Sequence, residues 1–311
     1  MKISVVIPAH NRDTLLKETL QALLNQNFPK QEYEIIVVGY YKNTTKKVIQ
    51  DLNSSQIKYF EIDSPWPDQK RNVGWKNANT NIVAFTDDDC IPQKDWLTNL
   101  VHAFNQNPDI AGIEGKTTQD NQKLFFHATE NLTGRKFPAC NFAVKKEWLE
   151  KIHGFDESYH FFREDTDLAF KIISANGKIL FDPSVIVYHP PRKISWKNIL
   201  NEIILIKGDV RLYKKFPKLY SHYLGFLCKS SWKQSFFSWT ILFLITYALI
   251  LNFIIGVFTA IILLFIFRFI ISMQGKRFSI QEFLIFNFTT VIRDLLFPFY
   301  FFYYWITIKV S

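Results

Sequence analysis

About the first 190 residues of this 311-residue chain alternate between apolar runs of strand length and stretches with helical spacing. The expected strands are Ile3 to Pro8, Tyr33 to Val38, Ile57 to Ile62 and Asn81 to Thr86. Helices are expected at about 13–26, at 68–79 and from Trp96 onward. Such alternation predicts βαβ units and a mostly parallel sheet, whose ligand site lies at the carboxyl ends of the strands.

Three consecutive carboxylates, Asp87, Asp88 and Asp89, come directly after the fourth expected strand, with no basic residue until Lys94. Adjacent carboxylates repel one another, and a divalent cation with oxygen ligands holds such groups together. The metal in turn can hold a diphosphate. The triplet taken alone leaves a solvated acidic turn open as the alternative, but its position at the end of a strand favours a ligand site.

A second acidic segment, REDTDLAFKI, places Glu164, Asp165 and Asp167 at the start of an expected helix. Acidic residues are favoured there as caps and dipole partners, so a structural role stands beside a catalytic one. Nearby backbone N–H groups should keep Asp165 ionised, which a general base requires. Farther on, His189 ends an apolar run, although a lone histidine is more often structural than a metal ligand.

The last third of the chain predicts membrane segments. From Phe236 to Met273 there are 38 residues with one charge, Arg268. A single helix of that length would measure about 57 Å, against a hydrocarbon core of about 30 Å. We therefore expect two crossings, at about 236–253 and 254–273.

A further apolar stretch, 283–308, is interrupted by Arg293, Asp294 and Pro298. It is either a third crossing or a re-entrant or interfacial segment, and the charged pair with the proline favours the latter. Upstream, the segment from Ile199 to Tyr213 has the pattern of an amphipathic helix. It is expected to lie on the membrane surface, with ordinary packing beneath the catalytic part as the alternative.

Ten basic residues lie between Pro191 and Lys233 against two acidic ones, which accounts for +8 of the net charge of +9. By the positive-inside rule, the N-terminal part and the C-terminus are cytoplasmic and a short hairpin is outside. We therefore expect a multi-pass protein of a bacterial-type inner or plasma membrane. The basic stretch is expected to meet anionic membrane lipids, and nucleic acid is not expected as a partner.

Three cysteines, Cys90, Cys140 and Cys228, are widely spaced and form no CxxC or Cys/His motif for zinc. They fit a reducing compartment, which agrees with a cytoplasmic catalytic part. The first residues, KISVVIPA, are expected to form a strand, because the run is too short and wrongly flanked for an export signal.

Five segments occur in a fixed order: SVVIPAHNR, QKRNVGWKNANTNIVAFTDDDCIP, GFDES, REDTDLAFKI and VIVYH. Together they resemble the inverting family-2 glycosyltransferases over roughly residues 1–190. The resemblance implies an α/β catalytic domain at 1–195 with the GT-A fold of nucleotide-diphospho-sugar transferases, a Rossmann-like, mostly parallel sheet. A basic amphipathic juxtamembrane segment, 196–235, and a membrane domain of C-terminal transmembrane helices, 236–311, would follow.

The resemblance also implies which residues form the site. Those expected to bind the nucleotide sugar are Pro8, Ala9, Asn11, Arg12, Lys70, Arg71, Asn72, Asp87 and Asp88. A divalent metal, Mg²⁺ or Mn²⁺, would be held by Asp89, Asp87 and His189, with Asp89 the better candidate for direct contact. Asp165, beside Glu164, would be the catalytic base. The acceptor side would include Trp66, Ala139, Cys140 and Asn141, although Trp is more often a packing residue.

The implied chemistry is consistent with these residue types. An acceptor hydroxyl is a poor nucleophile at neutral pH, so a carboxylate takes its proton as the new bond forms. A metal neutralises the departing nucleoside diphosphate, and holding donor and acceptor in line lowers the barrier further. Attack from the face opposite the leaving group inverts the anomeric carbon.

One segment departs from the family pattern. Where relatives usually carry an acidic residue after the second strand, this chain reads VVGYYKNTT. Gly39 and Tyr40 cannot accept a hydrogen bond from a base as a carboxylate can. Tyr40 either stacks on the base or is an ordinary loop aromatic, and a uridine nucleotide is correspondingly less certain as the donor.

Three functions follow as hypotheses. The leading one is a membrane-anchored inverting glycosyltransferase that moves a sugar from a nucleoside-diphosphate sugar to a polyprenyl-linked or cell-surface glycan. The second is an inactive nucleotide-sugar-binding membrane scaffold, which the departure at Gly39 and Tyr40 leaves open. The third, a pore or transporter, would have few crossings per chain.

Overall fold

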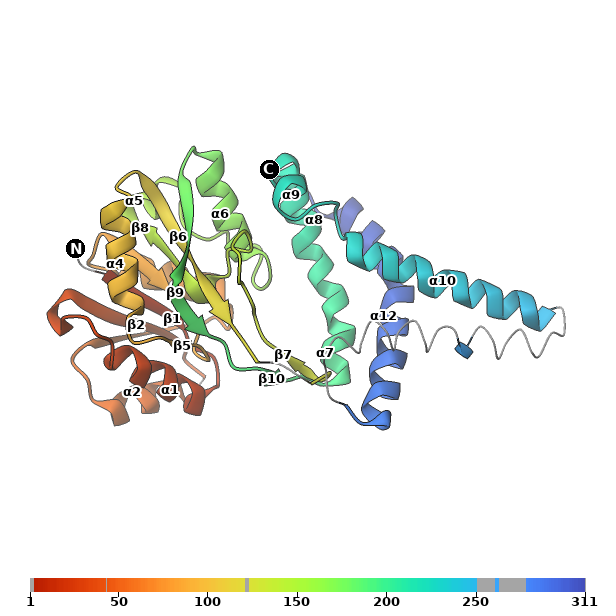
Figure 1. Ribbon diagram of the computed structural model, residues 1–311, viewed down its shortest axis with the longest axis horizontal. Coiled ribbons are helices and arrows are strands. Elements are labelled where there is room, and N and C mark those ends of the chain that lie inside the picture. The colour runs from red at the N-terminus through yellow and green to blue at the C-terminus, as the bar shows by residue number, and fades with distance from the viewer. Residues whose placement is uncertain (1–2, 43, 121–122, 251–260, 263–277, 311) are drawn as a thin grey trace. The chain divides into compact units, whose positions relative to one another are not determined.

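The computed structural model describes residues 3–42, 44–120, 123–250, 261–262 and 278–310. They belong to two compact units, Met1–Gln119 with Ala128–Pro190 and Asp120–His127 with Pro191–Ser311. Figure 1 follows both along the chain by colour. The crossing expected at 254–273 lies outside the described residues apart from 261–262, and so does the end of the one expected at 236–253.

An eight-stranded sheet forms the centre of the first unit, in the order β3-β2-β1-β4-β8-β6-β9-β5. Its strands are β1 (Ile3–Pro8), β2 (Tyr33–Tyr40), β3 (Ile57–Ile62), β4 (Ile82–Phe85), β5 (Ile91–Pro92), β6 (Ile110–Thr118), β8 (Phe142–Lys145) and β9 (Lys178–Tyr188). The neighbours among β1 to β4 pair in parallel, as does β6 with β9. The sheet is nevertheless mixed, because β8 runs antiparallel between β4 and β6, and β5 runs antiparallel to β9.

Helices pack on this sheet and hold the ends of the strands in place. They are α1 (Asp13–Leu24), α2 (Thr45–Leu52), α3 (Pro67–Lys76), α4 (Trp96–Gln106), α5 (Lys146–Lys151) and α6 (Glu164–Ser174), with 3₁₀ turns η1 (Lys30–Glu32) and η2 (Ala139–Asn141). Leu16 and Leu20 of α1 share a buried core with Val5 and Ile7 of β1. Val5 and Ile7 lie on the same face of β1, and burying these apolar side chains against α1 helps to fix the turn that follows the strand.

Helix α3 approaches β1 unusually closely. A Cβ atom at Gly74 would lie 2.3 Å from Val6 Cγ1, so only glycine lets the helix and strand pack at this distance. The contact brings the first turns of α3, with Lys70 and Arg71, to the end of the sheet where β1 and β4 finish.

The second unit is mainly helical. The short strands β7 (Phe126–His127) and β10 (Arg192–Lys193) pair antiparallel. Its helices are α7 (Trp196–Asn201), η3 (Glu202–Leu205), α8 (Ile206–Lys215), α9 (Pro217–Tyr223), α10 (Lys229–Ile250) and α12 (Ile280–Thr307). The expected amphipathic helix at 199–213 is divided among α7, η3 and α8, and its apolar side packs along α12, where Ile199 shares an apolar cluster with Phe286.

Helix α12 is continuous for 28 residues, through Arg293, Asp294 and Pro298. Arg293 does not interrupt it because its guanidinium donates to Glu202 Oε2 at 2.7 Å and to Asp294 Oδ1 at 3.0 Å. Within the described residues, α12 is the one helix long and apolar enough to cross a membrane, judged by length and composition. The described part of the chain therefore does not support the expected multi-pass arrangement.

Candidate active site

The turn after β1 is tied to the acidic triplet that follows β4, the neighbouring parallel strand. His10 N donates to Asp88 Oδ2 at 2.6 Å, and Arg12 Nη1 donates to Asp88 Oδ1 at 2.8 Å and to Asp89 Oδ2 at 2.7 Å. Asn11 lies between them with a φ of 51°, in the left-handed region that asparagine tolerates better than most residues. The predicted nucleotide-sugar residues of this turn therefore meet the predicted metal ligands.

Asp88 is the member of the triplet whose hydrogen bonds hold the turn after β1 in place. Both of its oxygens accept hydrogen bonds from the turn after β1. Burial raises the pKa of Asp88 to about 7, and the charge of Arg12 opposes that rise. The two donors stabilise its ionised form.

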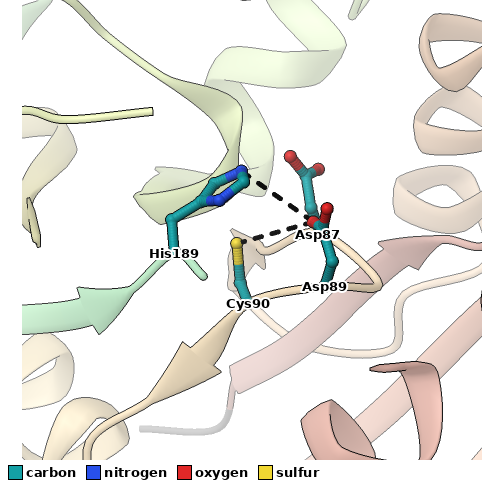
Figure 2. A group of neighbouring side chains, drawn as sticks. All are labelled: Asp87, Asp89, Cys90 and His189. Carbon is teal, nitrogen blue, oxygen red and sulfur yellow. Dashed lines mark hydrogen bonds and ion pairs between the residues drawn. The ribbon is translucent and has the colours of Figure 1, made fainter. Parts of the chain in front are cut away.

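Asp87, Asp89, Cys90 and His189 form a group whose potential ligand atoms all lie within 4.8 Å of one another. Figure 2 shows the histidine facing the carboxylates from the end of β9. His189 Nε2 is 3.9 Å from Asp89 Oδ1, and its Nδ1 lies 3.2 Å from Pro190 O. A carbonyl oxygen only accepts, so Nδ1 is the donor in that contact, and Nε2 is the ring atom that would bind a cation held between the histidine and the carboxylates.

This donor set fits a divalent cation that accepts oxygen and imidazole nitrogen. Two carboxylates and one imidazole suit Mn²⁺, and Mg²⁺ accepts the oxygens. Burial raises the pKa of the Cys90 thiol well above its usual value, and a neutral thiol is a poor ligand for such a cation. The residues fitted to hold a metal are therefore the three predicted, Asp87, Asp89 and His189.

Arg71 joins the acidic triplet to the second acidic segment. Its Nη2 donates to Asp87 Oδ1 at 2.8 Å, and its Nη1 donates to Glu164 Oε1 at 2.9 Å. Burial opposes the charge on Arg71, but the two carboxylates outweigh it and raise its pKa. The same guanidinium lowers the pKa of Asp87 against the effect of burial. A buried cation thus bridges residues 87 and 164.

The neighbours of Arg71 bind other parts of the protein. Lys70 is fully buried, and its Nζ donates to Ala9 O at 2.7 Å. Burial lowers the pKa of Lys70 to about 8. Asn72 exchanges hydrogen bonds of 2.9 Å with the backbone of Phe155 and donates to Glu157 Oε1 at 2.7 Å. Lys70 places a positive charge behind the β1 turn, whereas the Asn72 side chain fastens the GFDES loop.

Glu164 and Asp165 begin α6, directly after Arg163, whose φ of 74° turns the chain into the helix. Asp165 Oδ1 accepts from Thr166 N at 2.6 Å, and its Oδ2 accepts from Ala139 N at 3.3 Å. These N–H groups lower the pKa of Asp165 as expected, but burial outweighs them and raises it. Burial therefore works against the ionised form of Asp165, which the backbone N–H groups alone were expected to maintain.

Burial also raises the pKa of Glu164, to about 7, and repulsion from Asp165 adds to the rise while Arg71 opposes it. Because the two carboxyl groups are neighbours, a negative charge on one disfavours a negative charge on the other. A carboxylate with a raised pKa is a stronger base toward a hydroxyl proton than an exposed one.

The predicted acceptor residues are placed in two different environments. Trp66 is 40 % exposed and stacks on the His160 ring, with centroids 5.0 Å apart and planes 18° from parallel. Cys140 and Asn141 are buried, and Asn141 Oδ1 accepts from Trp96 Nε1 at 2.9 Å. Ala139 is buried too and reaches the site through its backbone N–H. Among these four, Trp66 alone presents a side chain to solvent.

Two residues of the site were not predicted. Cys90 lies beside His189, 99 positions away, and only its place directly after the triplet pointed to the site. His160 forms the aromatic stack with Trp66, and its backbone N–H donates to buried Asp68 at 2.7 Å. Its position four residues before Glu164 was the available signal.

Tyr40 ends β2 and packs edge-on against Tyr41, with ring centroids 5.2 Å apart. Lys42 Nζ lies 5.7 Å from the Tyr40 ring centroid. Tyr40, Tyr41 and Lys42 lie where the family pattern has a carboxylate. Any recognition of the nucleotide base here would therefore be by stacking or by charge.

The model of the family "Glycosyl transferase family 2" matches residues 4–168, and the chain belongs to this family. It is 27 % identical over 224 residues to the probable glycosyltransferase YdaM of Bacillus subtilis, covering 63 % of this chain and 52 % of that protein. It is 32 % identical over 111 residues to the poly(ribitol-phosphate) beta-N-acetylglucosaminyltransferase TarS of Staphylococcus aureus, covering 34 % of this chain and 19 % of TarS. The chain thus spans about half of the first relative and about a fifth of the second.

Two solved structures share the fold. The mannosyltransferase PcManGT of Pyrobaculum calidifontis, in complex with GDP-Man and Mn²⁺, has a TM-score of 0.59 at 20 % identity, covering 73 % of this chain and 69 % of that one. S. aureus TarS 1–349, in complex with UDP-GlcNAc, has a TM-score of 0.53 at 19 % identity, covering 72 % and 73 %. At such identities the likeness shows the fold alone, and it confirms the GT-A-like architecture expected from the sequence.

Proposed function

We propose that this chain is a membrane-associated, inverting glycosyltransferase that moves a sugar from a nucleoside-diphosphate sugar to a hydroxyl group of a glycan or lipid-linked glycan. The observation that carries the proposal is the Arg71 bridge, which joins the Asp87 side of a metal-fitted group to the Glu164–Asp165 pair. This bridge supports a cation site for a diphosphate beside a base for a hydroxyl.

In this proposal each group has one role. Asp87, Asp89 and His189 would hold a divalent cation, which when bound supplies positive charge for the departing diphosphate. Arg12 and Lys70 add fixed positive charge at the β1 turn, where Ala9 and Pro8 would border the nucleotide. Asp165 takes the proton of the acceptor hydroxyl as that oxygen attacks the anomeric carbon.

Glu164 and Arg71 act as positioning residues. Arg71 favours the ionised form of Glu164 through a buried ion pair, against the effect of burial, and negative charge on Glu164 disfavours negative charge on Asp165 and so strengthens Asp165 as a base. Trp66 with His160 offers a stacked aromatic surface on which a sugar ring of the acceptor can lie. Relatives named for teichoic-acid polymers support a cell-surface glycan as the acceptor class.

The membrane part of the proposal assigns α12 to the interface rather than to a crossing. Glu202, Arg293 and Asp294 pair near the middle of α12, where a spanning helix would place three charges in hydrocarbon. Exposed aromatic residues near its end, such as Tyr303 and Trp305, suit the head-group region. The first unit is assigned to the cytoplasmic side of that membrane.

The test is nucleoside-diphosphate release by the purified full chain, measured with a panel of UDP-, GDP- and dTDP-sugars, glycan acceptors and Mn²⁺. We expect release with one nucleotide class, and a loss of about 10²-fold or more in kcat for Asp165→Asn. Asp182→Asn, which removes a half-buried carboxylate within β9 that accepts hydrogen bonds from Ser184, is the matched control and should keep wild-type turnover. Equal trace release by all three proteins would instead support the inactive nucleotide-sugar-binding scaffold.

A further inference from the structure

A concave site lies in the helical unit, outside the residues assigned to sugar transfer. It is a groove of about 600 Å³ between η3–α8 and the C-terminal end of α12. Three of its lining residues are cationic and none is acidic. The lining consists of Ile204, Lys207, Arg211, Tyr303, Tyr304, Thr307, Ile308 and Lys309.

The cations come from both walls of the groove. Lys207 and Arg211 are four residues apart on α8 and therefore lie on one face of that helix, while Lys309 follows α12. The walls are fastened together by Lys214, whose Nζ donates to Trp305 O and, at 2.8 Å, to Ile308 O. Lys214 therefore caps the end of α12.

The rim of the groove combines hydroxyl groups with exposed apolar surface. Tyr303 and Tyr304 supply phenolic hydroxyls beside the cations. Ile204, which lines the groove, is 49 % exposed, and Ile306, in the last turn of α12, is 75 % exposed. A soluble anion would use the charges and leave this apolar rim in water, whereas a lipid would use both.

We propose that this groove binds the phosphate of an anionic membrane phospholipid. Lys207, Arg211 and Lys309 neutralise the phosphate, the tyrosines lie at head-group level, and the acyl chains cover the exposed isoleucines. The inference rests on the interfacial placement of α12 proposed above. It assigns a purpose to three of the basic residues in and beside the juxtamembrane region that transfer chemistry does not use.

The test is native mass spectrometry of the purified full chain in a neutral detergent, titrated with dioleoyl phosphatidic acid or phosphatidylcholine and no sugar donor. We expect phosphatidic acid to bind preferentially, and Lys207→Gln/Arg211→Gln/Lys309→Gln to weaken it by more than about tenfold. The control variant, Lys197→Gln/Lys218→Gln/Lys229→Gln, removes three exposed charges from the same unit and should bind like wild type.

Three outcomes would overturn the proposal: equal binding of both lipids, equal loss in both triple variants, or displacement of the lipid by the same concentration of inorganic phosphate. The third would show a site for free phosphate instead. Lipid binding is read without donor or turnover, so its failure would leave the proposed transfer activity untouched. Conversely, a protein that binds the lipid but transfers no sugar would refute the proposed transfer activity and leave the lipid site standing.

Discussion

Replacing Arg71 by methionine should destabilise the first unit far more than loss of a surface ion pair. The Arg71 side chain is 5 % exposed and pairs with Asp87 at 2.8 Å and Glu164 at 2.9 Å. Removing one partner of a buried ion pair costs about 3–5 kcal/mol, because the remaining charges stay buried and uncompensated. For a unit of this size that corresponds to a loss of roughly 6–20 °C in Tm.

The loss should also depend on pH. Without Arg71 the pKa of Glu164, already raised to about 7 by burial, rises further. A carboxyl group whose folded-state pKa lies above its unfolded value stabilises the fold below that unfolded value and loses the contribution as pH rises through the folded pKa. The deficit of Arg71→Met should therefore be smaller at pH 6 than at pH 8.

Differential scanning fluorimetry of the full chain at both pH values measures this directly. Lys58→Met is the matched control, because the Lys58–Glu34 pair at 2.6 Å is formed by a side chain that is 43 % exposed. Its loss should cost no more than about 1 kcal/mol. The reasoning would be refuted by an Arg71→Met protein that loses no more stability than Lys58→Met, or by a deficit that is larger at pH 6.

Two further predictions follow from the site. The rate of transfer under kcat/KM conditions should fall as pH decreases through the pKa of Asp165, which burial raises above its usual value. Glu164→Gln should move this pH profile to lower pH by removing the repulsion between the two carboxylates, and an unmoved profile would count against their interaction. Mn²⁺ should raise the Tm of the wild-type chain and of Cys90→Ser, because the neutral thiol is no ligand, but not of Asp89→Ala, which lacks a ligand. An equal rise in all three proteins would place the cation elsewhere.

The position of the site was predictable because ligands bind at the carboxyl ends of the parallel strands of such a sheet. Apolar runs gave β1 and β4, and parallel neighbours end at the same edge, so the β1 turn and Asp87 to Asp89 had to meet. The antiparallel strands of the mixed sheet were harder to predict from the sequence, because β5 has two residues and β8 four. A sequence pattern carries no information on which way such short strands run.

The partners inside the site were harder to predict because they are distant in the chain. Arg71 was expected near the nucleotide sugar, but its ion pair with Glu164 joins residues 93 positions apart. Asn72 had the same polar character and instead fastens a loop. The pKa of Asp165 was misjudged because backbone donors are visible in a helix start, whereas the depth of burial is a property of the folded chain.

The central claim is that Asp87, Asp89 and His189 hold a cation beside the Glu164–Asp165 pair. The most direct measurement is anomalous diffraction from crystals of the full chain soaked with Mn²⁺ and a nucleoside-diphosphate sugar analogue. The account predicts a manganese peak within coordination distance of Asp89 and His189 Nε2, with the diphosphate on its open side. An analogue bound at the ends of β1 and β4 with no manganese peak between those side chains would contradict it.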